Sequence, residues 1–98
     1  MAPEPEPEPE PYDLVVAGPA ARAIAEDLPE AVAAAVVDLT TGPLPKDPTI
    51  VGKPLRRELA GLWSARRGTF RILYRIDHDR REVIVLRIAH RRDVSRSR

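Results

Sequence analysis

Hydrophobic positions follow a helical period in the first half of the chain and a two-residue period in much of the second half. Residues 12–17 alternate as a strand does, and the Gly-Pro pair after them predicts a turn into a helix over 19–28. Pro29 starts a second helical pattern over 30–41. Because so few residues separate the two patterns, we expect an antiparallel helical hairpin.

The two-residue period of hydrophobic positions begins again after a proline-rich connector at residues 43–54. Residues 62–67, 70–77 and 82–90 are predicted as three strands, joined by tight turns. The resulting order is β-α-α-β-β-β. It predicts an α+β fold, with the helical hairpin packed on a mostly antiparallel four-stranded sheet. Trp63 is expected to pack in the core.

Alternation also predicts which side chains share a face of the sheet. In the last strand we expect one apolar side made of Ile84, Leu86 and Ile88. The opposite side is then made of Val83, Val85, Arg87 and Ala89. If the apolar sides of all strands face the helices, a group of arginines projects from the other face: Arg66, Arg71, Arg75, Arg87 and Arg91. Lys53, Arg56 and Arg57 are expected at its rim.

Charge is divided unevenly along the 98 residues, although the formal total is only +1. Residues 1–50 carry 2 Lys/Arg against 10 Asp/Glu, a net charge of −8, and residues 51–98 carry 14 against 5, a net charge of +9. Arginine keeps its charge and binds phosphate through two parallel hydrogen bonds, so the basic half suits nucleic acid. Two other interpretations remain open: a solvated face paired with nearby carboxylates, and a surface for an acidic protein.

Composition limits the remaining function classes. The chain has no cysteine and two distant histidines, so we expect no metal and no cofactor. No apolar run is long enough to span a membrane, and no signal-peptide pattern opens the chain, so we expect a cytoplasmic protein. Residues 1–11 form a Pro/Glu tail that we expect to be disordered, residues 12–94 the domain, and residues 95–98 a basic tail.

Two segments carry a family resemblance. GKPLRRELAGLWSARRGTFRILYRID at 52–77 and VIVLRIAHRRDV at 83–94 resemble the RelE/ParE toxin superfamily, on its RelE side. The resemblance implies the toxin of a bacterial toxin–antitoxin pair, with a ribosome-dependent endoribonuclease activity that cuts mRNA without metal. The implied partners are a cognate acidic antitoxin and the 70S ribosome with its mRNA, and the toxin–antitoxin complex is expected to bind operator DNA.

The resemblance also implies roles for individual residues. Arg71 matches the strand arginine of the G-x-[FY]-R motif and Arg91 the arginine of the C-terminal motif, which makes them the catalytic pair. Substrate binding is then expected from the remaining cations: Arg66, Arg87, Arg75, Lys53, Arg56 and Arg57.

The chain departs from the family where mRNA-cutting members carry lysines and a tyrosine. Leu62 and Ser64 stand at the lysine positions, and Ser95 at the tyrosine position. These departures predict weak or atypical cleavage. They leave two alternatives open, a ParE-like gyrase inhibitor and a degenerate toxin that only binds its antitoxin.

Overall fold

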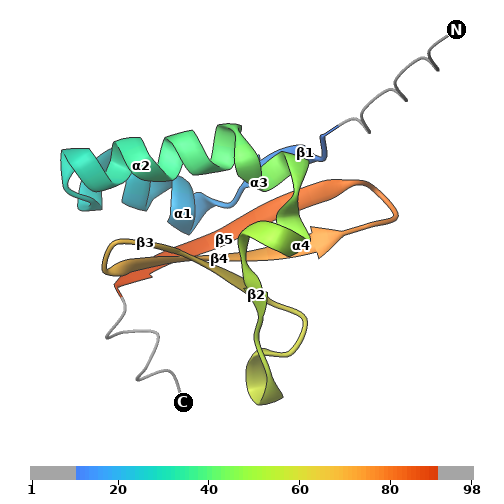
Figure 1. The fold of residues 1–98 in the computed structure, drawn as a ribbon. Coiled ribbons are helices and arrows are strands. Elements are labelled where there is room, and N and C mark those ends of the chain that lie inside the picture. Colours follow the sequence, from blue (N-terminus) through green and yellow to red (C-terminus); the bar gives the residue numbers. More distant parts are fainter. Residues whose placement is uncertain (1–10, 91–98) are drawn as a thin grey trace, which may run out of the picture.

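The computed structural model describes residues 11–90, and in it helices cover one face of a five-stranded sheet (Figure 1). The strands lie in the order β1-β5-β4-β3-β2, with β1 parallel to β5 and all other pairs antiparallel. Their bounds are β1 Asp13–Val16, β2 Lys53–Pro54, β3 Trp63–Arg67, β4 Phe70–Asp77 and β5 Glu82–His90. The predicted α+β class is confirmed.

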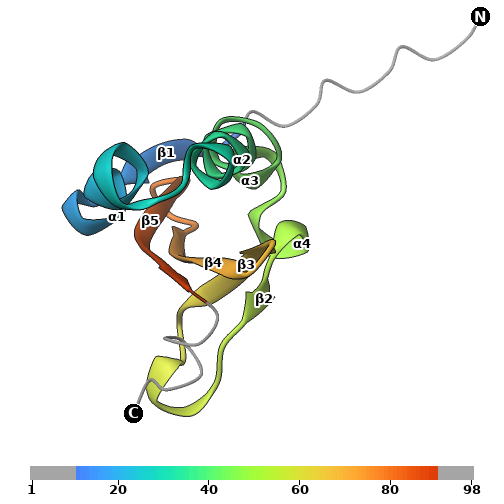
Figure 2. The same cartoon turned by 90° about the vertical axis from the view of Figure 1, so that its left-hand side faces the viewer.

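Three helical segments cover the sheet from the same side, as a second view shows (Figure 2). α1 (Gly18–Arg22) continues into a π-helical turn, η1 (Ala23–Asp27), and α2 (Glu30–Thr41) follows. α2 occupies the span predicted from the periodicity. α3 (Pro43–Lys46) then completes the layer. None of the helices in residues 11–90 is long and apolar enough to cross a bilayer.

The predicted count of four strands was wrong, and the proline-rich connector at 43–54 contains short helices and a strand that were not predicted. Pro43 and Pro48 each open a one-turn helix, α3 and α4 (Pro48–Val51), because proline is preformed for the first helical position. β2 then adds the fifth strand by pairing Lys53 with Ser64 and Pro54 with Trp63. A two-residue edge strand carries no periodicity, so the sequence pattern could not reveal it.

Most of the buried core lies between the helices and the covered face of the sheet. α2 contributes Val36 and Leu39, and α3 contributes Leu44. The sheet contributes a larger set: Ala65, Ile72, Tyr74, Val83, Val85 and Ile88. Trp63 packs against this cluster and stacks on Tyr74 with ring centroids 6.4 Å apart and planes 24° apart. The prediction that Trp63 is a packing residue is therefore confirmed.

Tyr74 also fixes the edge of the sheet that carries β2. Its hydroxyl donates a 2.6 Å hydrogen bond to the carbonyl oxygen of Pro48, in α4. Burial of the side chain raises the pKa of Tyr74 to about 12, while a backbone hydrogen bond from Gly52 acts in the opposite direction. A Cβ atom on Gly52 would overlap the Tyr74 hydroxyl and approach the Ser64 carbonyl oxygen, so only glycine fits this close approach. The contact therefore holds the segment before Lys53 against β4.

The predicted faces of the last strand were wrong in its first half. Val85 pairs with Tyr74, but Arg87 pairs with Leu73, so Leu86 is an extra residue in β5. This β-bulge reverses the alternation. Val83 and Val85 consequently face the helices and are fully buried, whereas Ile84 shares the open face with Arg75. Ile88 and Arg87 lie on the predicted sides, because they follow the bulge.

Candidate functional site

Cationic side chains gather on the face of the sheet that no helix of residues 11–90 covers. Arg66 in β3 stands directly opposite Arg71 in β4, and Lys53 in β2 stands opposite Ser64 in β3. Residues that face each other across a ladder share a face, and so do alternate residues of one strand. Ser64 and Arg66 are such alternate residues. The register of β2, β3 and β4 therefore brings Lys53, Arg66 and Arg71 to the same surface.

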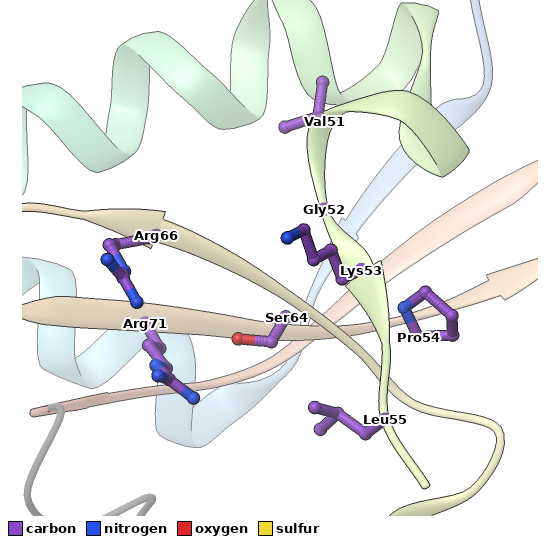
Figure 3. Close-up of a pocket in the computed structure, with 8 residues that line it drawn as sticks. All are labelled: Val51, Gly52, Lys53, Pro54, Leu55, Ser64, Arg66 and Arg71. Atoms are coloured by element: carbon purple, nitrogen blue, oxygen red, sulfur yellow. The ribbon is translucent and has the colours of Figure 1, made fainter.

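These three cations line a pocket of about 440 Å³. Within residues 11–90, the lining is Val51, Gly52, Lys53, Pro54, Leu55, Ser64, Arg66 and Arg71. Figure 3 shows Arg66 and Arg71 on one side and Lys53 and Leu55 on the other, with the Ser64 hydroxyl between them. The pocket thus spans the gap between the central strands and the chain that leaves α4.

Two more predicted arginines lie on this face, outside the pocket lining. Arg87 in β5 pairs with Leu73, diagonally next to Arg71. Arg75 lies four residues beyond Arg71 in β4, which is roughly 13 Å along a strand. Its cross-strand partner is Ile84. Arg87 is therefore placed to contact a chain that extends from the pocket, whereas Arg75 belongs to a separate part of the face.

The other residues predicted for the site, Arg56, Arg57 and Arg91, are not among the described residues that line the pocket. Arg56 and Arg57 are exposed in the segment between β2 and β3, which leaves the sheet on the side away from the helices (Figures 1 and 2). Neither residue is part of the pocket lining. Arg91 and Ser95 lie outside the described residues, so the role predicted for Arg91 stays a prediction.

The electrostatics of the pocket favour an anion. Within residues 11–90, neither Arg66 nor Arg71 forms an ion pair with a carboxylate. Two guanidinium groups that face each other across a ladder repel, and a bound phosphate would offset that repulsion through charge-assisted hydrogen bonds. In the same described range, no group of three His, Cys, Asp or Glu side chains is placed to hold a metal ion.

The position of Lys53 is the main feature that sequence reasoning missed. The sequence places a serine, Ser64, where mRNA-cutting relatives are expected to carry lysine, and it predicts Lys53 as a substrate-binding residue at the rim of the face, not beside Ser64. In the structure, β2 places Lys53 beside Ser64 across the ladder. A cation is therefore present at this point of the face, although it comes from the neighbouring strand.

The chain matches known proteins over most of its length. Residues 13–94 match the model of the family described as ParE toxin of type II toxin-antitoxin system, parDE. Toxin RelG of Mycobacterium tuberculosis is 56% identical over 69 residues, which are 70% of this chain and 79% of that protein. Toxin RelE of the same organism is 45% identical over 80 residues, which are 82% of this chain and 81% of that protein.

Solved structures agree with the sequence matches. The crystal structure of the RelBE2 toxin–antitoxin complex from Mycobacterium tuberculosis contains a chain that superimposes with a TM-score of 0.77 at 50% identity, covering 84% of this chain and 100% of that one. The archaeal RelE–RelB complex from Pyrococcus horikoshii shares the fold, with a TM-score of 0.59 at 20% identity over 84% of this chain and 97% of that one. The chain therefore belongs to the RelE/ParE superfamily and is a RelE- and RelG-like toxin of a type II toxin–antitoxin system.

Proposed function

We propose that this toxin is a ribosome-dependent endoribonuclease that cuts mRNA at the pocket between β2 and β4, without a metal ion. The observation that carries the proposal is the convergence of Lys53, Arg66 and Arg71 on one open pocket with no carboxylate paired to the two arginines in residues 11–90. A packing role would not require three cations to face the same space. A phosphodiester supplies the negative charge that such an arrangement stabilises.

The proposed chemistry uses the RNA's own 2′-hydroxyl. Its oxygen attacks the adjacent phosphorus, the bond from phosphorus to the 5′-oxygen breaks, and a 2′,3′-cyclic phosphate and a 5′-hydroxyl are left. The proton leaves the 2′-oxygen and another is delivered to the 5′-oxygen. The phosphorane between these states carries extra negative charge, which Arg71 and Arg66 are placed to stabilise from the sheet and Lys53 from the edge strand.

The arginines are assigned to charge stabilisation and not to proton transfer, because a guanidinium with a pKa above ~12 is a poor general base. Arg91 also contacts the scissile phosphate in this proposal, as the family resemblance implies. Arg87 holds the flanking phosphate next to Arg71. Arg75 and the exposed Arg56 and Arg57 make the weaker, salt-sensitive contacts of an RNA chain that extends past the pocket.

We also propose the partners of this chain. The two relatives solved as toxin–antitoxin complexes make a cognate antitoxin the expected inhibitor. An acidic antitoxin segment would compete with RNA for the cationic face, because both are polyanions. The ribosome, the mRNA and, for the toxin–antitoxin complex, operator DNA are the other partners that we propose, in the cytoplasm.

A paired substitution tests the nuclease proposal. Arg71→Gln and Arg75→Gln each remove one positive charge from the same face of the same strand, but only Arg71 lines the pocket. We expect Arg71→Gln to lower mRNA cleavage by ~10²–10³-fold, the usual loss when one transition-state donor is removed. Arg75→Gln is expected to stay within a few-fold of wild type. Primer extension on cellular mRNA after induced expression measures both.

Three results would contradict the proposal. Equal cleavage by Arg71→Gln and wild type would remove the pocket from the chemistry. Growth arrest with intact mRNA and damaged DNA would indicate a gyrase inhibitor. Expression without growth arrest would indicate a toxin that only binds its antitoxin. Copurification of each variant with the antitoxin, and its thermal unfolding, show whether the substitution has changed the fold.

A further inference from the structure

The two sides of the pocket differ in chemistry, and the difference says more about its ligand than the positive charge does. Arg66 and Arg71 form one side, from the sheet. Leu55 contributes an apolar surface to the opposite side, where it points from the chain after β2 toward the arginines (Figure 3). An inorganic anion would use only the cationic groups, the two arginines and Lys53. A ligand that has a charged end and a flat apolar body would also use Leu55.

Leu55 is held in this position by the backbone. Its N–H donates a 2.8 Å hydrogen bond to the carbonyl oxygen of Leu62, directly after the β2–β3 pairing ends. Earlier in the chain, the contact between Tyr74 and the segment from Pro48 to Gly52 fixes α4 to the sheet. The segment from Pro48 to Leu55 is therefore hydrogen-bonded to the sheet near its start and at its end, which fixes the position of the Leu55 side chain.

The aromatic residue of β3, Trp63, does not serve as a stacking surface here. Trp63 lies on the helix-covered side of β3 and stacks on the buried Tyr74. Single-stranded RNA sites commonly use an aromatic ring to stack a base. No aromatic side chain among the described residues 11–90 lines this pocket, so its apolar contact with a ligand comes from aliphatic groups, mainly Leu55.

We propose that the pocket binds one nucleotide unit, with the phosphate on Arg66, Arg71 and Lys53 and the face of the base against Leu55. The inference rests on the proposed function and extends it to a defined nucleotide subsite. A volume of about 440 Å³ is within the range of small-ligand pockets. An aliphatic contact has no hydrogen-bond pattern, so this subsite accepts any base and leaves sequence choice to the ribosome.

The test uses the purified full-length chain with three probes: adenosine 3′-monophosphate, inorganic phosphate and adenosine. Isothermal titration measures each affinity at two salt concentrations. We expect the nucleotide to bind about tenfold tighter than phosphate, because burying roughly 50–60 Å² of apolar surface changes an equilibrium constant by about that factor. The ratio between nucleotide and phosphate is expected to stay constant as salt rises, since only the phosphate contacts are screened.

Leu55→Asn and Ile50→Asn are the matched variants. Both exchange an aliphatic side chain for an amide in the same part of the chain, but Ile50 is 79% exposed and does not line the pocket. Leu55→Asn is expected to abolish the tenfold preference and keep the affinity for phosphate, which also reports that the cationic side is still folded. Ile50→Asn is expected to change neither affinity. Leu55→Met, which keeps the apolar surface, is expected to retain the preference. Leu55→Ala, which removes most of that surface without adding a polar group, is expected to lose it and replaces Leu55→Asn if that variant does not fold.

Equal affinities of wild type for nucleotide and phosphate would overturn the subsite. So would a preference that survives in Leu55→Asn, or one that Ile50→Asn also removes. These outcomes are separate from failure of the nuclease proposal. If the subsite is wrong, wild-type toxin still cuts mRNA in cells, whereas if the nuclease proposal is wrong, mRNA stays intact whatever the nucleotide affinity.

Discussion

The two faces of the sheet carry opposite chemistry on the same strands, and neighbouring residues show the contrast. Ile72 is fully buried under the helices, while Arg71, directly before it, lines the pocket on the open face. On the covered face the buried Tyr74 hydroxyl has a hydrogen-bond partner. On the open face the guanidinium groups of Arg66 and Arg71 have no carboxylate partner within residues 11–90.

This difference indicates that the covered face stabilises the fold, whereas the open face is available to bind a ligand. Burial of apolar area stabilises the fold roughly in proportion to that area. Unpaired like charges on an exposed face add little stability and repel one another. We therefore expect substitutions on the covered face to change unfolding, and substitutions on the open face to change RNA binding and cleavage.

The largest expected effect is a stability loss on the covered face. Ile72→Ala removes a fully buried side chain from the middle of the core. It is expected to lower the free energy of unfolding by about 2–5 kcal/mol, a large share of the ~5–15 kcal/mol of a typical domain. Arg71→Gln, one residue away, is expected to stay within about 0.5 kcal/mol of wild type. Urea unfolding of both variants measures the contrast, and similar losses would contradict the division between the two faces.

The next effect concerns the hydrogen bond that ties α4 to the sheet. Tyr74→Phe removes the hydroxyl that donates to the Pro48 carbonyl oxygen. We expect a loss of about 1 kcal/mol at neutral pH. Because Lys53 and Leu55 follow this anchor in the chain, the variant is also expected to bind nucleotide more weakly.

The same substitution has a pH signature. The pKa of Tyr74 is about 12 in the fold and 10.0 in the reference state, so the folded protein holds this proton more tightly. The stability that this provides is complete below pH 10 and is lost as pH rises toward 12. Wild type is expected to lose stability over this range more steeply than Tyr74→Phe. Identical pH profiles for the two proteins would show that Tyr74 does not titrate as proposed.

The smallest expected difference is between two deletions that each remove the bulge. Deletion of Leu86 and deletion of Arg87 each restore strict alternation in β5, so Val83, Val85 and Ile88 keep their side of the sheet in both variants. Both are expected to unfold cooperatively with similar midpoints.

Only the deletion of Leu86 keeps the arginine of β5 diagonally next to Arg71. The variant without Arg87 is expected to bind single-stranded RNA with a salt dependence lower by about 0.7, the slope of one phosphate contact. Equal slopes would remove Arg87 from the RNA path. Loss of cooperative unfolding in both variants would show that the sheet requires the bulge.

Part of this arrangement follows from local patterns. The alternation of FRILYRID places Arg71 and Ile72 on opposite faces, and the short turn at Gly68 places Arg66 opposite Arg71. The helix at 30–41 follows from its apolar stripe and the proline before it. Each of these features depends on residues close in sequence, so the chain alone determines them.

Tertiary structure decided the rest. The run VIVLRI in β5 is apolar at both parities, so no local pattern marks Leu86 as the extra residue, and the faces of Val83 and Val85 depend on pairing with β4 and with the parallel β1. β2 has only two residues, and its position depends on the contact of Tyr74 with α4. The cationic side of the pocket was therefore predictable from alternation, whereas the side formed by Lys53 and Leu55 was not, because hydrogen bonds between residues distant in sequence place it.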